Sequence, residues 1–266
     1  MARNSDLLNL SDKVAIVTGG RVGIGFGIAS RLAESGCRVT IVSRNGAKGE
    51  EAAKKLRAEG NAVMSVAADV SIEEEVKRMV KETISEYGHI DILVNNAGIY
   101  PQIPLSRMTL SDFKKVCAIN MEGVFLCTKY VAERMIARKK GGKIINITSI
   151  DALHPSSVGL AHYDASKHGV WGFTKNIALE LAPYGISVNA IAPGGIMTPG
   201  VQKLQSSGGM KQADIKAMQD AFVKKIPMGR LGIPDDVGKV ALFLASDMSS
   251  YMTGSQIVVD GGVLLM

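Results

Sequence analysis

Short apolar runs alternate along the chain with longer segments in which apolar residues recur every three or four positions. The short runs, rich in valine and isoleucine, predict buried strands, and the longer segments predict amphipathic helices. The predicted strands span residues 14–17, 38–42, 62–67, 92–94, 143–148, 186–191 and 256–259. Because these runs are continuously apolar, they indicate a parallel sheet covered by helices on both faces. We therefore predict an α/β fold, a doubly wound parallel seven-stranded sheet of the Rossmann type.

The helical segments fall between the predicted strands. Helices are predicted at 24–34 and 47–58, and Ser71 with Glu74 has the spacing of a capping box that opens a helix running to about Tyr87. No repeat, low-complexity linker or change in composition divides the chain. A single domain that includes all 266 residues is therefore the prediction.

One segment, 193–234, departs from this regular alternation. It is rich in glycine and serine and carries only a short helical pattern near its middle. Such an irregular insertion in a compact domain is typical of a binding loop. We predict a substrate lid at about 196–226, with the segments 99–105 and 150–162 as the other walls of the substrate site.

The composition argues against several classes of protein. Hydrophobic residues make up 46% of the chain and charged residues 21%, as in ordinary globular domains. The net charge of +6 is spread over segments where Lys and Arg alternate with Asp and Glu, which favours solvated helix faces over a nucleic-acid or membrane surface. Three cysteines without a C-x-x-C spacing favour a reducing cytoplasm and argue against a metal site. Residues 1–11 lack the apolar core of a signal peptide, so we expect a cytoplasmic protein.

A glycine-rich turn follows the first predicted strand and precedes a helix. Its glycines allow a tight turn and a close backbone approach to a pyrophosphate, while the helix directs its N–H groups and positive dipole at the anion. A P-loop is excluded because no Gly-Lys-Ser/Thr follows, and a tight turn without a ligand is the alternative. The place of the turn in an α/β chain favours a nucleotide. The cofactor contacts predicted here are Gly19, Arg21, Gly23, Ile24 and Gly25.

The end of the second strand distinguishes the nicotinamide dinucleotides. An acid there would bind a ribose 2′-hydroxyl, whereas a basic residue would accommodate a 2′-phosphate. The chain has Ser43 and Arg44 at this point and no carboxylate. The planar guanidinium of Arg44, assisted by Arg21, can bind a phosphate. The pattern favours NADP over NAD, with a loop-capping role of Arg44 as the alternative.

Tyr163 and Lys167 lie four residues apart in a predicted helix, so both project from the same face. A phenol titrates near 10, and a neighbouring ammonium lowers that pKa toward the range useful for acid–base catalysis. Ser149 ends the fifth predicted strand, where the carboxyl ends of parallel strands line a ligand crevice. Its hydroxyl can stabilise a substrate oxygen. Taken singly, Ser149 is typical of a strand-end cap and the other two of a surface helical pair.

These motifs together resemble the short-chain dehydrogenase/reductase family, from about Ser11 to Gly262. The resemblance implies that Asn120, Ser149, Tyr163 and Lys167 form a catalytic tetrad. It also implies cofactor contacts beyond the glycine turn. These are Ser43, Arg44, Asp69, Val70, Asn96, Ala97, Gly98, Tyr163, Lys167, Pro193, Gly194, Ile196 and Thr198. One departure weakens the NADP assignment, since many NADP-binding relatives have a basic residue where this chain has Val22.

The resemblance further implies the reaction. Ser149 and Tyr163 would bind a carbonyl oxygen, Tyr163 would supply the proton, and Lys167 would bind the nicotinamide ribose and lower the tyrosine pKa. Asn120 would hold a water that links Lys167 to solvent. A homotetramer is implied, built on the helices 120–137 and 164–181 and on the last strand. We expect an oxidoreductase that uses NADP(H) on a ketone or secondary alcohol, with a 3-oxoacyl thioester favoured.

Other functions stay open at this point. An NAD-dependent polyol, sugar or secondary-alcohol dehydrogenase would share the tetrad. A catalytically silent nucleotide sensor would have no use for it. A methyltransferase that binds S-adenosylmethionine would need an acid near Ser43, which the chain lacks. His154 and His162 have no metal-ligand spacing, and we expect them to line the pocket or lie at the surface.

Overall fold

The computed structural model describes residues 4–199 and 220–266. Its sheet has seven strands in the order β3-β2-β1-β4-β5-β6-β7, and every neighbouring pair is parallel. The strands are β1 (Val14–Thr18), β2 (Arg38–Ser43), β3 (Val63–Ala67), β4 (Ile92–Asn95), β5 (Gly142–Ile147), β6 (Ile186–Pro193) and β7 (Gln256–Val259). Each predicted strand is present within two residues of its expected bounds. The doubly wound parallel sheet predicted from the sequence is therefore confirmed.

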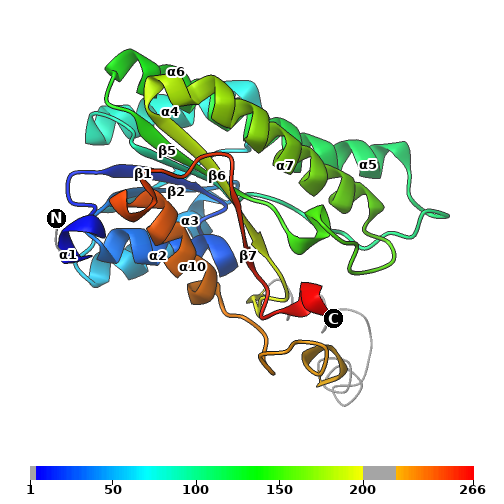
Figure 1. The fold of residues 1–266 in the computed structure, drawn as a ribbon. Coiled ribbons are helices and arrows are strands. Elements are labelled where there is room, and N and C mark those ends of the chain that lie inside the picture. Colours follow the sequence, from blue (N-terminus) through cyan, green and yellow to red (C-terminus); the bar gives the residue numbers. More distant parts are fainter. Residues whose placement is uncertain (1–3, 200–219) are drawn as a thin grey trace.

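Helices cover both faces of the sheet (Figure 1). On one side α2, α3 and α10 pack against it, and on the other side α4, α6 and α7 do so. The helices are α1 (Asn4–Leu7), α2 (Gly23–Glu34), α3 (Gly46–Ala58), α4 (Glu73–Tyr87), α5 (Leu110–Cys117), α6 (Gly123–Arg138), α7 (Ala161–Leu181) and α10 (Pro234–Ala245). The three layers form one domain, as the uniform composition predicted.

The continuous apolar runs have a simple structural cause. Successive side chains of a strand point to opposite faces of the sheet. On the central strand β1, Val17 belongs to the core under α2 and α10, whereas Ile16 belongs to the core under α4, α6 and α7. Both side chains are fully buried. A strand with helices on both sides therefore needs apolar residues at every position.

Two glycines bring α2 and α10 into close contact. A Cβ atom on Gly27 would lie 2.7 Å from the backbone of Pro234, and one on Gly238 would lie 2.7 Å from the carbonyl oxygen of Gly27. No side chain fits at either position without moving a backbone. Because α2 begins at the glycine-rich turn, this contact also fixes the N-terminal end of α2, where the nucleotide site is predicted.

A buried polar chain ties the other layer to the sheet. Asn95 Nδ2 of β4 donates to Thr128 Oγ1 of α6 and to Asn146 Oδ1 of β5. Asn146 Nδ2 in turn donates to Thr174 Oγ1 of α7, at 2.9 Å. All four side chains are buried and satisfied, and such a network specifies one arrangement of the elements it joins. It sets α6 and α7 against the strand ends that carry the candidate site.

Two local predictions are wrong. Ser71 and Glu74 form no capping box: α4 begins at Glu73 after an Ile72 N-cap that supplies no side-chain hydrogen bond. The Ser71 hydroxyl instead donates to Asp69 Oδ1 at 2.6 Å, since an aspartate two residues earlier is a closer acceptor.

The helix expected at 120–137 begins instead at Gly123. It continues a helical run that starts with α5 and passes through a π-helical turn, Ala118–Glu122, which contains Asn120. The predicted lid at about 196–226 includes residues 200–219, which lie outside the described residues.

Candidate active site

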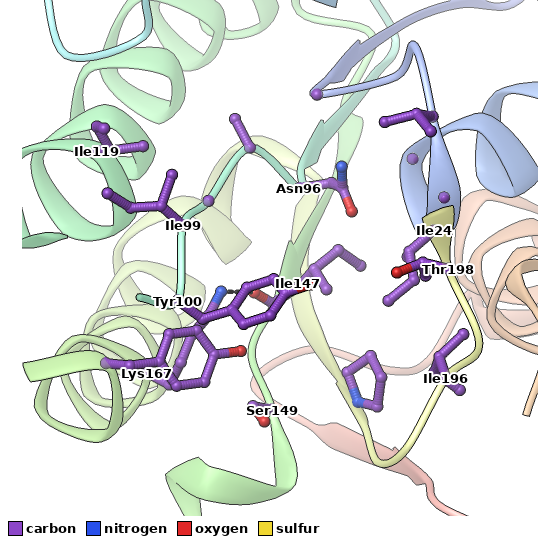
Figure 2. Close-up of a pocket in the computed structure, with 18 of the residues that line it drawn as sticks. Ile24, Asn96, Ile99, Tyr100, Ile119, Ile147, Ser149, Lys167, Ile196 and Thr198 are labelled. Atoms are coloured by element: carbon purple, nitrogen blue, oxygen red, sulfur yellow. Dashed lines mark hydrogen bonds between the residues drawn. The ribbon is translucent and has the colours of Figure 1, made fainter. Parts of the chain in front are cut away.

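A cleft of about 800 Å³ opens at the carboxyl ends of the strands. There the chain leaves β1 toward one edge of the sheet and β4 toward the other, which is the switch point where doubly wound sheets bind ligands. Residues after β1, β2, β3, β4, β5 and β6 all reach it. Figure 2 shows Lys167, Tyr100 and Ser149 on one side of the cleft and Ile24, Thr198 and Ile196 on the other.

The cleft gathers nearly every predicted catalytic and cofactor-binding residue. Asn120 is the exception, because it is fully buried behind the wall. The predicted residues that line the cleft are Gly19, Arg21, Gly23, Ile24, Gly25, Ser43, Arg44, Asp69, Val70, Asn96, Ala97, Gly98, Ser149, Tyr163, Lys167, Pro193, Gly194, Ile196 and Thr198. They come from six strand ends and from α7, which are far apart in the sequence.

The glycine-rich turn presents an uncapped helix end to the cleft. Val22 is the N-cap of α2 and provides no side-chain hydrogen bond to the first N–H groups. Gly19 has a φ of +66°, and a Cβ atom on Gly25 would lie only 2.4 Å from the carbonyl oxygen of Gly19. The turn thus folds tightly on itself and leaves backbone N–H donors facing the cleft. A pyrophosphate fits such a donor set.

The first strand and the fourth are joined at the cleft by Thr18. Its hydroxyl accepts hydrogen bonds of 3.0 Å from the backbone N–H groups of Asn96 and Ala97, and donates to the carbonyl of Val94. Asn96 Nδ2 donates to the carbonyl oxygen of Thr18 at 2.9 Å. The loop after β4 is therefore held against the glycine-rich turn, and these hydrogen bonds give Asn96 a structural role.

The far end of the cleft carries Arg44 beside an acid. Arg44 extends from the end of β2 with 59% of its side chain exposed, and its Nη1 lies 4.0 Å from Asp69 Oδ2. The other oxygen of Asp69 accepts from the hydroxyl and the N–H of Ser71. Arg21 also lines the cleft. The residues at this end can hold an adenosine with a phosphate on its ribose.

Lys167 reaches the cleft from α7 and is almost completely buried, with 5% of its surface exposed. Its Nζ donates a 2.7 Å hydrogen bond to the carbonyl oxygen of Ile147, shown as a dashed line in Figure 2. Burial disfavours the charged form and lowers the pKa of Lys167 to about 8, although the negative charge of Asp151 opposes this. The ammonium lies 5.6 Å from the centre of the Tyr163 ring.

Tyr163 lies in the first turn of α7 and packs edge-to-face on Tyr100, with ring centres 6.0 Å apart. Burial raises the pKa of its phenol well above 10, the hydrogen bond with Ser149 lowers it, and the charge of Asp151 raises it further. The backbone N–H of Tyr163 donates to Nδ1 of His162 at 3.0 Å. The phenol is therefore protonated at neutral pH, as an acid must be.

His162 does not have the position expected of it. It is fully buried, does not line the cleft, and accepts the N–H of Tyr163 at the start of α7. The N-cap Leu160 offers no side-chain acceptor there, so the imidazole takes over part of that role. His154 lies at the surface, one of the two positions we expected for it.

Asn120 supports the site from behind. Its side-chain oxygen accepts the N–H of Ile99 at 2.9 Å, and its amide donates to the carbonyl of Ile99 and to Ser166 Oγ. A Cβ atom on Gly98 would lie 3.3 Å from Asn120 Oδ1 and 3.8 Å from Lys167 Nζ. Asn120 and Lys167 thus meet at Gly98. Both amide hydrogens of Asn120 are donated to groups within the protein, so its side chain holds the loop after β4 in place.

Several lining residues were not predicted. Ile147 supplies the carbonyl that anchors Lys167, and Ile119 and Leu231 add apolar wall. Ile147 could have been found, because the crevice rule applied to Ser149 covers the end of the same strand. Ile119 and Leu231 carry no sequence signal of their own, since an apolar residue at a helix or loop position usually means core packing.

The comparisons with known proteins agree with this geometry. The family model described as enoyl-(acyl carrier protein) reductase matches residues 19–264. The chain is 38% identical over 258 residues to a 3-oxoacyl-[acyl-carrier-protein] reductase of a Synechocystis strain, which spans 96% of this chain and 98% of that one. The chain belongs to the short-chain dehydrogenase/reductase family.

Two further relatives extend the match. A 3-oxoacyl-[acyl-carrier-protein] reductase of Chlamydia trachomatis is 40% identical, over 96% of this chain and 98% of its own. The crystal structure of a short-chain type dehydrogenase/reductase from Mycobacterium marinum superposes with a TM-score of 0.89 at 37% identity, over 97% and 98% of the two chains. As a member of this family, the protein is an oxidoreductase that uses a nicotinamide cofactor and acts on CH–OH or C=O groups.

Within the described residues, no helix has the length and apolar character needed to cross a membrane.

Proposed function

We propose that this protein reduces ketones with NADPH and that a 3-oxoacyl thioester is its substrate. The observation that carries the proposal is the convergence of Ser149, Tyr163 and Lys167 on the cleft that also contains the glycine-rich turn. The names of the Synechocystis and Chlamydia relatives support the substrate class. The test measures NADPH consumption with 3-oxoacyl thioesters, simple ketones and keto sugars. Turnover of polyols with NAD alone would contradict the proposal.

The proton chemistry is proposed for two hydroxyls. Ser149 and Tyr163 bind the carbonyl oxygen, where hydrogen-bond donors stabilise the negative charge that develops during reduction. A bound nicotinamide supplies the hydride to the carbonyl carbon. Tyr163 transfers its proton to the oxygen, since its phenol is protonated at neutral pH. The alcohol forms and Tyr163 is left as a phenolate.

Lys167 is proposed to bind the nicotinamide ribose and to stabilise that phenolate. With a pKa of about 8 it carries a charge at neutral pH, and its hydrogen bond to Ile147 holds the ammonium beneath the Tyr163 ring. A proton must then return to Tyr163 before the next cycle. Asn120 fixes the loop that contains Gly98 next to Lys167.

The preference for NADP is proposed from the charges at the far end of the cleft. Arg44 and Arg21 both line it, and the nearest acid, Asp69, lies 4.0 Å from Arg44 with one oxygen already engaged by Ser71. A 2′-phosphate would gain a charge-assisted hydrogen bond from the exposed guanidinium. Fluorescence titration with both cofactors tests this: tighter binding of NAD would contradict it.

We also propose that the protein forms a homotetramer. Two large apolar side chains, Phe125 on α6 and Leu179 on α7, are 47% and 77% exposed. A second group lies near the edge strand β7 and the C-terminus, where Val258 is 40% and Leu265 is 86% exposed. Exposed apolar groups on two separate faces support two different contacts between subunits. Light scattering tests the assembly, and a monomer at assay concentration would contradict it.

A further inference from the structure

A fully buried histidine that the reaction above does not use lies directly before Tyr163. His162 is the second residue of α7, and its side chain does not line the cleft. Its Nδ1 accepts the backbone N–H of Tyr163 at 3.0 Å. The first N–H groups of a helix have no acceptor within the helix, and the N-cap Leu160 supplies no side-chain acceptor. The imidazole therefore anchors the backbone of the residue proposed to act as the acid.

This hydrogen bond determines which form of His162 is present. A backbone N–H can only donate, so Nδ1 carries no proton, and the neutral imidazole has its proton on Nε2. Nε2 is buried and has no hydrogen-bond partner among residues 4–199 and 220–266. A buried donor without a partner is unfavourable. Within this part of the chain, the bond to Tyr163 is thus the one hydrogen bond that offsets the burial of the ring.

Protonation of the imidazole would remove this anchor. In the imidazolium both ring nitrogens are donors, so Nδ1 could no longer accept the N–H of Tyr163. The positive charge would also be buried at the N-terminus of α7, where the helix dipole is positive. Protonation of His162 would therefore free the first turn of the helix that carries Tyr163.

Two carboxylates face the imidazole from the elements around it. On α5, the pKa of Asp112 is lowered by the Thr109 hydroxyl and, to a smaller extent, by the charge of His162. On α7, burial raises the pKa of Asp164, and the nearby His168 and His162 oppose this. Both carboxylates favour the imidazolium, whereas burial and the helix N-terminus favour the neutral ring. Because these effects oppose one another, acid can shift the ring between its two forms.

We propose that the neutral imidazole of His162 positions Tyr163 for catalysis and that protonation of His162 releases the first turn of α7. This inference rests on the proposed role of Tyr163 as the acid. The phenol must lie against the substrate oxygen, and displacement of a catalytic group by about 1 Å lowers the rate by about 10²-fold. His162 thus acts through Tyr163, without touching substrate or cofactor.

Two variants of His162 separate the acceptor from the proton. His162→Asn has an amide oxygen at about the place of Nδ1 and cannot be protonated, so kcat should stay within about threefold of the wild type and lose its fall at acid pH. His162→Gln has its amide one bond farther along the side chain and leaves the N–H of Tyr163 without an acceptor. We expect its kcat to fall by about 10–100-fold, with little change in NADPH binding. An Asn variant no better than the Gln variant would overturn the inference.

A double variant distinguishes positioning of Tyr163 from simple support of the fold. In the Tyr163→Phe background no phenol remains to be positioned, so His162→Gln should lower the residual kcat by less than about twofold. A residue that only stabilises the fold would lower kcat by the same factor in both backgrounds. Equal factors would therefore overturn the role of His162 in positioning Tyr163.

A titration of the wild type does not depend on turnover. His162 and Tyr163 are the only His–Tyr pair in the sequence, so ¹³C-carbonyl histidine combined with ¹⁵N-tyrosine marks the Tyr163 amide uniquely. The ¹⁵N signals of the imidazole, assigned by their loss in either variant, should show the proton on Nε2. As acid protonates Nδ1, the hydrogen-exchange protection of the Tyr163 amide should fall by about tenfold or more, whereas in His162→Asn it should persist.

Two results of this titration would overturn the inference. One is protonation of His162 without loss of protection at the Tyr163 amide, and the other is an imidazole that stays neutral until circular dichroism shows unfolding. Neither result requires a ketone substrate, so the failure of the inference is distinguishable from that of the proposed function. If one variant does not fold, the other still assigns the ring signals, and the wild-type titration decides.

Discussion

The Nζ of Lys167 donates a 2.7 Å hydrogen bond to the carbonyl oxygen of Ile147, twenty residues earlier in the chain. The bond joins α7 to the end of β5, at the point where the next residues lead to Ser149. Burial destabilises the charged form of the Lys167 side chain and lowers its pKa from 10.5 to about 8. A buried cation at this place lowers the stability of the folded protein, whereas an apolar side chain of similar size would not.

Replacing Lys167 by Met should stabilise the fold and abolish turnover. A lowered pKa means that the folded state binds the lysine proton less tightly than the unfolded state. The resulting loss of folding stability is complete below pH 8, where Lys167 is charged in both states, and disappears as the pH rises to 10.5. It amounts to about 3 kcal/mol, and after loss of the bond to Ile147 we expect a net gain of about 1–2 kcal/mol at pH 7. Urea unfolding at pH 7 and at pH 10 measures the difference, which should shrink at the higher pH.

Tyr163→Phe should lower kcat for ketone reduction by about 10²–10⁴-fold, the usual contribution of a positioned acid. The ring and its contact with Tyr100 are preserved, so cofactor affinity should change little. Steady-state kinetics and cofactor titration measure both. Tyr100→Phe is the control, because it removes a hydroxyl from the partner ring and should retain most of the activity. Wild-type turnover in Tyr163→Phe would refute the proton-transfer role.

Arg44→Ser should weaken NADPH binding by about 10–100-fold, since hydrogen bonds to charged groups contribute about 1.5–3 kcal/mol. NADH binding should stay within about twofold, because its ribose has no phosphate for the guanidinium to meet. Fluorescence titration with each cofactor gives the two constants. Lys48→Ser removes a nearby cation in the first turn of α3 that does not line the cleft, and should leave both constants unchanged.

Gly27→Ala should destabilise the protein by about 1–3 kcal/mol, in spite of the better helix propensity of alanine. The added Cβ would lie 2.7 Å from the backbone of Pro234, so α2 and α10 must separate. Urea unfolding measures the loss. Ser30→Ala on the same helix, at a partly exposed position, should stay within about 0.5 kcal/mol of the wild type. Equal effects of the two variants would mean that the helix contact is not tight.

Leu179→Asp should reduce the molar mass measured by light scattering, if α7 packs between subunits as proposed. A charge placed in an apolar contact costs more than the contact contributes. Ile72→Asp, at an exposed apolar position before α4, is the control and should leave the assembly unchanged. An unchanged mass in Leu179→Asp would argue against α7 as an interface.

Much of the fold was accessible from the sequence because its signals are local. A run such as that around Val17 is apolar at every position, which only a strand covered on both faces requires. The spacing of Tyr163 and Lys167 fixed their common face in the same way. Local rules failed where another hydrogen-bond partner competed. Ser71 bonds to Asp69 instead of capping α4, and Asn120 lies in a π-helical turn with its side chain bonded to Ile99.

By itself, then, the sequence determined the parallel sheet, the glycine-rich turn and the family of motifs, because each depends on residues close together in the chain. Only the tertiary structure decided how those motifs meet: which carbonyl anchors Lys167, which groups bury Tyr163, and which carboxylate accepts the hydroxyl of Ser149. These depend on contacts between strand ends and helices far apart in the sequence, and on burial, which changes the pKa of Lys167 and Tyr163 in ways that no local pattern encodes.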